Sequence, residues 1–349
     1  MISVPGYFDR RQLAHEPVQE LHNGGWAAYA EESSRAEIIA SSFAELRPAK
    51  DFGLEPLLQV HDAAYVGFLR SAFQEWRATG RDGDAIGYTW PVVKRRPLNF
   101  DRIDAKLGLY SYDAATPIAK GTWEASYWSA QTALSAMSAI LDGETTASFA
   151  LCRPPGHHSG PDYCGGYCYL NNAAIAAEYA RRSGRRVAIL DIDYHHGNGT
   201  QDVFYDDPDI MFVSIHADPV TDYPFFWGHA DERGEGPGEG KTLNLPLPRG
   251  TDFQAYDAAL GKALEELRAH EADLLVLSFG ADTFEDDPIS YFRLRQDDYR
   301  SIGGRIASTG LPVLIVMEGG YAVDALGRNV EALLAGIGDQ QARAPSVDR

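Results

Sequence analysis

Acidic and imidazole side chains crowd into residues 191–195 (DIDYH), directly after an apolar run. If that run is a β-strand, its alternation points Asp191, Asp193 and His195 toward the same side. Such crowding is costly unless a cation or hydrogen bonds compensate for it. A further carboxylate, Asp282, follows another apolar run. Asp193, His195 and Asp282 are therefore candidate ligands of a catalytic zinc ion, with a solvated acidic turn as the alternative interpretation.

Two adjacent histidines, His157 and His158, follow the rigid segment RPPG. A catalytic imidazole needs a partner that fixes which of its nitrogens carries the proton. Asp191 and Asn198 are the candidate partners, because neither is needed as a zinc ligand. A carboxylate partner would raise the pKa of one histidine, whereas a neutral amide would leave the other nearer its ordinary value. This difference predicts divided acid and base roles.

A tyrosine, Tyr321, follows the double glycine Gly319 and Gly320 at the end of the last apolar run. Two glycines allow a sharp turn, which would let the tyrosine lean over a site at the strand end. Its hydroxyl could then donate a hydrogen bond to the oxyanion of a tetrahedral intermediate. Taken alone, a tyrosine after glycines is more often a packed loop residue.

The second half of the chain alternates apolar runs with segments of helical spacing, which predicts βαβ units and a parallel sheet. The expected strands are Ser148–Cys152, Val187–Leu190, Ile210–Ile215, Leu274–Phe279 and Leu311–Met317, and the expected helices include Ala173–Arg182 and Phe253–His270. Each run is followed within a few residues by Gly, His or Asp. Because ligands of open α/β sheets bind beyond the carboxyl ends of the strands, we expect these residues to converge at one sheet edge.

The chain has 349 residues, of which 44% are hydrophobic, and we interpret residues 1–349 as a single domain. Residues 78–123 mix charges, Gly, Pro and aromatics, which predicts a long functional loop, and the polar residues 339–349 predict a flexible tail. The odd number of cysteines, three, argues against a disulfide framework. Cys164 and Cys168 could begin a metal clip, but no second pair completes it.

The net charge of −19 disfavours a nucleic acid as partner. The sequence contains neither a long apolar run nor the pattern of a signal peptide, so we expect no membrane association and a cytoplasmic location.

The motifs RPPGHH, GGYCYLNN, DIDYHHGNGTQ, GADTFEDDP and MEGGY together resemble the arginase–deacetylase superfamily. Within it, the chain is most similar to histone-deacetylase-like amidohydrolases, and closest to acetylpolyamine amidohydrolases, from about Gly53 to Ile337. The resemblance implies a three-layer α/β/α fold around an eight-stranded parallel sheet. It also implies one Zn²⁺ per chain held by Asp193, His195 and Asp282, tandem catalytic histidines, and Tyr321 as the residue that polarises the carbonyl. Asn198 stands where many histone deacetylases have Asp.

The same resemblance implies how substrate and a second cation are held. The Gly166 carbonyl would accept a hydrogen bond from the substrate amide, and Tyr167 and Tyr223 would form the walls of a narrow tunnel. A structural K⁺ would be bound, mostly through backbone oxygens, by Asp191, Asp193, His195, Ser214 and Ile215. The 78–123 segment would be an insertion that forms a homodimer and narrows the tunnel mouth. Asp104 and Asp113 are its candidate substrate-binding acids, whereas Ala115 occupies a position that is acidic in the family.

We therefore predict zinc-dependent hydrolysis of acetamide bonds, with acetylated polyamines or diamines as the small cationic substrates. His158 would act as the base toward water, and a protonated histidine, His158 or His157, would donate to the leaving amine. The alternatives are a zinc amidohydrolase for other small amides or acetyl-lysine, and an inactive fold that serves as a ligand-binding or scaffold protein. The sequence leaves open the substrate's chain length and the choice between zinc and iron(II).

Overall fold

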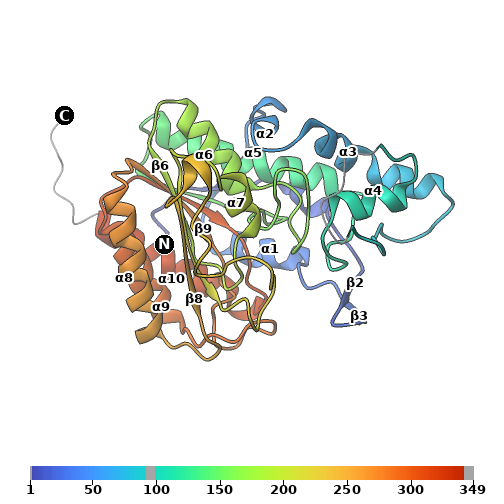
Figure 1. Ribbon diagram of the computed structural model, residues 1–349. Helices are drawn as coiled ribbons and strands as arrows, with labels where there is room; N and C mark the ends of the chain where they lie inside the picture. The colour runs from blue at the N-terminus through green and yellow to red at the C-terminus, as the bar shows by residue number, and fades with distance from the viewer. Residues whose placement is uncertain (1, 92–98, 342–349) are drawn as a thin grey trace.

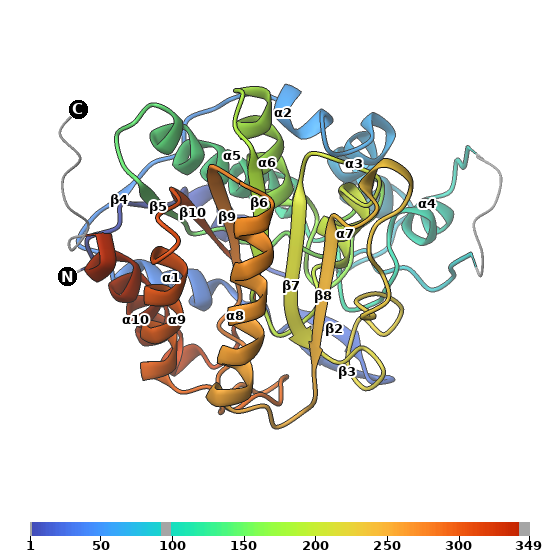
Figure 2. The same ribbon diagram turned by 60° about the vertical axis from the view of Figure 1, so that its left-hand side comes forward.

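An eight-stranded sheet lies at the centre of the computed structural model, which describes residues 2–91 and 99–341 (Figures 1 and 2). Its strand order is β4-β1-β5-β10-β9-β6-β7-β8, and every neighbouring pair is parallel. The strands are β1 (Gly6–Tyr7), β4 (Leu46–Arg47), β5 (Ala147–Ala150), β6 (Val187–Asp191), β7 (Met211–Ala217), β8 (Thr242–Leu247), β9 (Leu274–Phe279) and β10 (Val313–Met317). A separate antiparallel hairpin consists of β2 (Gln19–His22) and β3 (Gly25–Ala28).

Helices cover both faces of the sheet, which confirms the predicted three-layer α/β/α fold. They are α1 (Ser33–Ser41), α2 (Glu55–Leu58), α3 (Ala63–Ala78), α4 (Ile103–Tyr110), α5 (Thr122–Leu141), α6 (Asn172–Arg182), α7 (Asn198–Val203), α8 (Phe253–Ala269), α9 (Gln296–Ala307) and α10 (Val323–Gln341), with 3₁₀ turns at Arg10–Ala14 and Gly236–Gly238. None of the helices in the described part of the chain has the length and apolarity that a membrane crossing requires.

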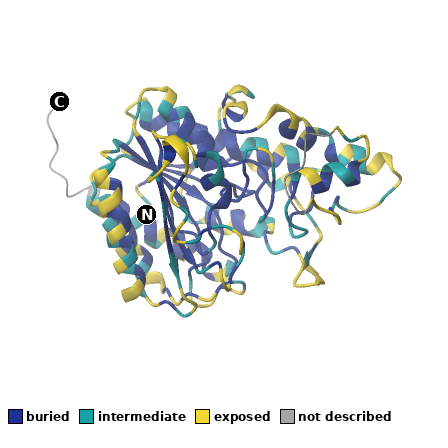
Figure 3. Cartoon of the chain, in the orientation of Figure 1, coloured by how far each residue is buried: buried dark blue, intermediate teal, exposed yellow. Residues whose placement is uncertain are grey.

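Two hydrophobic clusters lie on opposite faces of the sheet, and strand alternation divides the side chains between them. In β6, Ala188 and Leu190 join the cluster under α1, α8, α9 and α10, whereas Val187 and Ile189 join the cluster under α3, α5 and α6. The central strands are therefore buried on both sides, as Figure 3 shows. This double burial explains why their sequences are almost continuously apolar.

The predicted elements agree with the structure to within a few residues. Strand β9 has the predicted bounds, whereas β10 begins two residues later than expected, after Pro312, which has no N–H to donate to the ladder. Helix α6 begins after Asn171, whose side chain accepts a hydrogen bond from the backbone N–H of Ala174 at 3.0 Å. The organisation of residues 1–349 as one domain stays a prediction.

Two segments that were predicted to be irregular contain helix, so both predictions were wrong in part. The expected loop 78–123 includes α4, because Ile103 and Leu107 lie one turn apart and are buried against the cluster under α3. The expected tail 339–349 begins too early, since α10 continues to Gln341. Residues 92–98 of the first segment and 342–349 of the second lie outside the described residues.

Helices α9 and α10 pack closely because glycines face each other between them. A methyl group added at Gly336 would lie 2.1 Å from the backbone oxygen of Arg300, and one at Gly303 would lie 2.2 Å from that of Leu333. Neither backbone contact can give way without separating the two helices.

We therefore expect Gly336→Ala to lower the free energy of unfolding by about 1–3 kcal/mol, the usual cost of overpacking. The matched control is Gly67→Ala in α3, where an added methyl group meets nothing within 4 Å. That control is expected to stabilise the protein by up to about 1 kcal/mol, because alanine favours helix more than glycine does. Urea titration of both variants measures the difference, and equal stability would contradict the packing argument.

Candidate active site

The three predicted metal ligands lie together beyond the carboxyl ends of β6 and β9. The donor atoms of Asp193, His195 and Asp282 all lie within 4.8 Å of one another. Nδ1 of His195 is 3.0 Å from Asp282 Oδ2 and 3.4 Å from Asp193 Oδ1. Asp193 and Asp282 are almost completely buried. The structure thus brings the set together from segments almost ninety residues apart in the sequence.

The electrostatics of this cluster fit a dication. Burial and the neighbouring Asp193 charge raise the pKa of Asp282 to about 7. Burial opposes protonation of His195, but the two aspartates raise its pKa to about 10. A bound dication would balance both carboxylates and allow a neutral imidazole to act as ligand.

Two glycines make room for the carboxylates of the cluster. A methyl group at Gly280 would lie 2.0 Å from Asp193 Oδ2, and one at Gly319 would lie 2.6 Å from an oxygen of each aspartate. The Gly319 N–H also donates to Asp193 Oδ2 at 2.8 Å, which orients that carboxylate. The donor set and the space around it therefore fit one metal ion.

The tandem histidines have different partners. Nδ1 of His157 lies 2.9 Å from Asp191 Oδ2, and Nδ1 of His158 lies 2.6 Å from the amide oxygen of Asn198. Burial opposes protonation of His157, but Asp191 and Asp193 raise its pKa to about 10. Burial, reinforced by the charges of His157 and His195, holds the pKa of His158 well below its usual value. His158 is therefore the neutral imidazole, and it can accept a proton.

Tyr321 lies in the turn after β10 and is held from two sides. Its backbone N–H donates to Asp287 Oδ2 at 2.7 Å, and the guanidinium carbon of Arg35 lies 4.8 Å from the centre of its ring. Arg35 also donates to the carbonyl oxygens of Glu318 at 2.8 Å and Gly320 at 2.6 Å, on either side of the turn. Asp287 and Arg35 thus hold the backbone of the turn, and the backbone in turn fixes the position of Tyr321.

Gly166 and Tyr167 both have left-handed backbone conformations, with φ of 54° and 67°. A side chain at position 166 would overlap the imidazole of His158, whose Cδ2 would be 2.2 Å from an added methyl group. Such strain at a non-glycine residue is typical of functional sites. Tyr167 packs against Tyr321 with ring centroids 5.7 Å apart, and Tyr223 packs against His158 at 5.2 Å. Both predicted wall residues therefore border the candidate active site.

Asp113 and Asp104, the two predicted substrate-binding acids, have different surroundings. Asp113 accepts hydrogen bonds from the Gly166 N–H and the Tyr223 hydroxyl, each at 2.8 Å, so it holds residues of the site. Asp104 instead forms ion pairs with Arg81 at 2.6 Å and Arg102 at 2.9 Å. Since these arginines neutralise its charge, the prediction that Asp104 attracts a cationic substrate is revised.

Three of the predicted potassium ligands lie on neighbouring strands, with Asp191 paired opposite Ser214 in the β6–β7 ladder and Ile215 next to Ser214, whereas Asp193 and His195 follow the end of β6. The potassium ion itself stays a prediction. Ala115 packs against the cluster of Tyr29, Tyr167 and Tyr321, so an acidic side chain there would meet aromatic rings.

Several residues of the site were missed by sequence reasoning. Glu20, on the β2–β3 hairpin, accepts a hydrogen bond from the Tyr167 hydroxyl at 2.9 Å. Glu31 pairs with Arg35 at 2.7 Å and Arg153 at 3.0 Å, and all three are buried. No local pattern marks these N-terminal residues. Glu318 was visible in the motif MEGGY, and its side chain accepts hydrogen bonds from the backbone N–H groups of residues 156 and 157.

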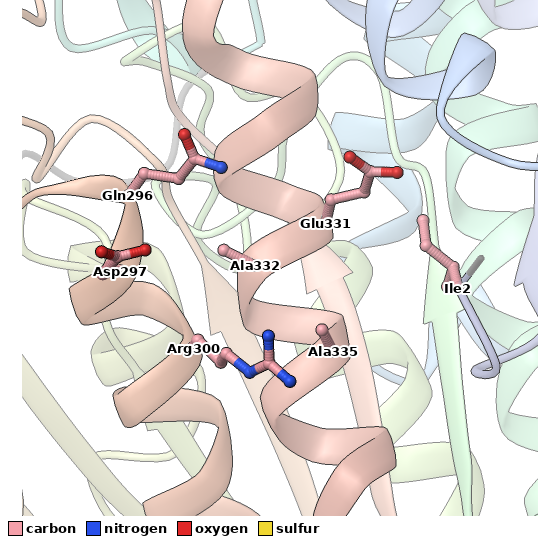
Figure 4. Close-up of a pocket in the computed structure, with 7 residues that line it drawn as sticks. All are labelled: Ile2, Gln296, Asp297, Arg300, Glu331, Ala332 and Ala335. Atoms are coloured by element: carbon pink, nitrogen blue, oxygen red, sulfur yellow. The ribbon is translucent and has the colours of Figure 1, made fainter.

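A surface pocket elsewhere on the molecule is lined by residues of α9 and α10 together with Ile2 (Figure 4). It contains none of the predicted site residues. The strand-end cluster therefore remains the candidate active site.

Comparison with known proteins gives concordant results. The family model of the histone deacetylase domain matches residues 26–337. The chain is 48% identical to acetylpolyamine amidohydrolase 2 of Pseudomonas aeruginosa, covering 95% of this chain and 97% of the relative. It is 44% identical to acetylpolyamine amidohydrolase of Mycoplana ramosa, covering 91% and 95%. The crystal structure of acetylpolyamine aminohydrolase from Burkholderia pseudomallei superposes with a TM-score of 0.93 at 40% identity, covering 97% of this chain and 99% of that one.

Replacement of Asp282 by Ala is expected to abolish both metal binding and amide hydrolysis, because only two of the three ligands would remain. The control is Asp273→Ala, which removes an acid at the opposite end of the same strand, β9. Metal analysis of the purified proteins and circular dichroism distinguish loss of metal from loss of fold. Full turnover by a metal-free Asp282→Ala protein would contradict the assignment.

Proposed function

The chain belongs to the histone deacetylase family and hydrolyses amide bonds, and from this premise we propose that it removes acetyl groups from acetylated polyamines and diamines. Zinc is the proposed metal, bound by Asp193, His195 and Asp282. The names of the relatives support the substrate class, since acetylpolyamine amidohydrolases match over almost their full length. The chemistry of the site supports it independently.

When bound, the metal would supply Lewis acidity that polarises an amide carbonyl and acidifies water. The chain's own residues would handle protons and orientation. The Tyr321 hydroxyl would donate a hydrogen bond to the carbonyl oxygen as negative charge develops on it, and the Gly166 carbonyl would accept one from the amide N–H. His158 would take a proton from the attacking water, because its low pKa keeps it neutral. His158 or His157, once protonated, would donate to the leaving amine.

The observation that carries the substrate proposal is a pair of carboxylates that flank the predicted aromatic walls. Glu20 is bonded to Tyr167, and Asp113 is bonded to Tyr223. Oε2 of Glu20 and Oδ1 of Asp113 are buried without a hydrogen-bond partner among the described residues. Unlike Asp104, neither forms an ion pair with Lys or Arg in that part of the chain. A distal ammonium group of a polyamine would satisfy such oxygens, whereas a neutral amide would leave them unpaired.

The insertion and the second cation belong to the same proposal. Residues 78–123 include the exposed aromatics Tyr88 and Trp90, which supports a homodimer formed through this segment. The proposed K⁺ would be held, mostly through backbone oxygens, by Asp191, Asp193, His195, Ser214 and Ile215, of which Asp191 and Ser214 pair across β6 and β7.

If Tyr321 supplies one hydrogen bond to the oxyanion, Tyr321→Phe should lower kcat by about 10²–10³-fold. Zinc content should stay unchanged, since the tyrosine is not a ligand. Steady-state kinetics with acetylated putrescine, together with metal analysis, measure both quantities. A variant with the kcat of the unaltered protein would show that this residue has no part in the reaction.

The pair of carboxylates predicts how substrate preference depends on pH. Burial, aided by the charge of Asp113, raises the pKa of Glu20 to about 7 against the opposing hydrogen bond from Tyr167. Glu20 is therefore mostly ionised only above about pH 7, so the advantage in kcat/KM of acetylated putrescine over a neutral acetamide of equal length should grow as pH rises through that value. Added salt should reduce the advantage, because it screens the acidic chain.

The variant Glu20→Gln should lose about tenfold of this advantage, which corresponds to about 1.4 kcal/mol for one charge-assisted contact. Asp104→Asn is the matched control and should leave the advantage unchanged, since two arginines already neutralise that acid. If the unaltered protein hydrolysed cationic and neutral amides equally well, the preference for polyamines would be contradicted, and only the general activity as an amide hydrolase would stand.

A further inference from the structure

The base assigned to the proposed reaction, His158, depends on a neutral amide for its proton arrangement. A carboxylate presents oxygen at both ends, but Asn198 presents an oxygen at one end and an NH₂ group at the other. The amide oxygen of Asn198 lies 2.6 Å from Nδ1 of His158. Because this oxygen accepts a hydrogen bond, the imidazole carries its proton on Nδ1 and keeps Nε2 free to accept another. The reversed amide would favour the opposite tautomer, in which Nε2 is already protonated and cannot act as a base.

Two further residues determine which way this amide points. The Tyr163 hydroxyl donates to Asp202 Oδ2 at 2.6 Å. Since a phenol has one hydrogen, the Tyr163 oxygen can then only accept, and it faces Asn198 Nδ2 at 3.4 Å.

Asp202 gives the chain of hydrogen bonds its direction. An ionised carboxylate only accepts, and Asp202 has no Lys or Arg ion-pair partner among the described residues. Its charge is met by the hydroxyl of Tyr163 and by the indole N–H of Trp227. The Tyr163 proton is therefore held toward Asp202 and away from Asn198.

We propose that Asp202 and Tyr163 are positioning residues that act through Asn198 to hold His158 in the tautomer with a free Nε2. Neither touches the metal ligands, and neither was singled out by the sequence. This inference rests on the proposed function, because it assumes that His158 is the base. Deacetylation by the unaltered protein tests that function separately.

The first test compares Tyr163→Phe in two backgrounds. In the otherwise unaltered chain it should lower kcat for acetylated putrescine by about tenfold, the scale of one hydrogen bond, while KM and zinc content change less than about twofold. In an Asn198→Asp background, Tyr163→Phe should lower kcat by less than about twofold. A carboxylate has an oxygen at both ends, so Tyr163 is not needed to orient it. Equal losses in the two backgrounds would mean that Tyr163 acts only through packing, which would overturn the proposal.

Controls separate this effect from a general loss of a tyrosine hydroxyl. Tyr127→Phe removes another phenol-to-carboxylate hydrogen bond, to Asp51, and should leave kcat unchanged. Asp202→Ala should reproduce the loss seen in Tyr163→Phe, whereas Asp202→Asn should retain most of kcat, since its amide oxygen still accepts from Tyr163. Failure of that conservative rescue would contradict the role of Asp202 as an acceptor.

The second test reads the tautomer directly and does not depend on activity. Selective ¹⁵N labelling of histidine in the full, zinc-loaded chain distinguishes the two neutral tautomers, with His158→Gln used to assign the signal. The unaltered protein should show His158 protonated at Nδ1, and Tyr163→Phe should show a mixture. An unchanged His158 signal in Tyr163→Phe would overturn the proposal even if deacetylation by the unaltered protein were confirmed.

Discussion

Buried negative charge at the carboxyl ends of three adjacent strands is the constraint on which the rest of the structure depends. Asp191 ends β6 and Asp193 follows it, Asp282 follows β9, and Glu318 follows β10. All four side chains are almost completely buried, and burial raises the cost of each charge. Backbone N–H groups and imidazoles lower that cost by donating hydrogen bonds to the carboxylates. Glycines contribute by leaving room for these groups to approach. The cluster is stable only if a cation or shared protons complete it.

The same charge gives two neighbouring histidines opposite properties. His157 and His158 are adjacent in the sequence, and the centroids of their rings are 4.1 Å apart. His157 faces Asp191 and Asp193, which raise its pKa, so it stays protonated on both nitrogens, whereas burial and the charge of His157 lower the pKa of His158, so it is a neutral imidazole. Partners drawn from distant strands and helices therefore determine the chemistry of each imidazole.

Sequence reasoning was most successful where one physical rule dominates. The central strands β6 and β9 were predicted because double burial requires continuous apolar runs, and their ligands were found because they follow those runs directly. Strands β1 and β4 were not found individually, since each has only two residues and leaves no periodic signal. The contributions of Glu20 and Arg35 were not predictable, because their partners lie more than a hundred residues away. Asp104 illustrates the converse case, since its charge is visible in the sequence but its arginine partners are not.

The contacts of Arg35 also bear on how the molecule is assembled during synthesis. Arg35 leaves the ribosome early, yet the carbonyl groups it binds belong to Glu318 and Gly320, more than 280 residues later. In a growing chain, Arg35 and its partner Glu31 must therefore stay exposed to solvent, or form non-native contacts, until β10 has been synthesised. Contacts of such long range close late and slowly in folding. The turn that carries Tyr321 is therefore expected to become ordered late, and a chain that ends before this turn lacks the tyrosine to which we assign the hydrogen bond to the oxyanion.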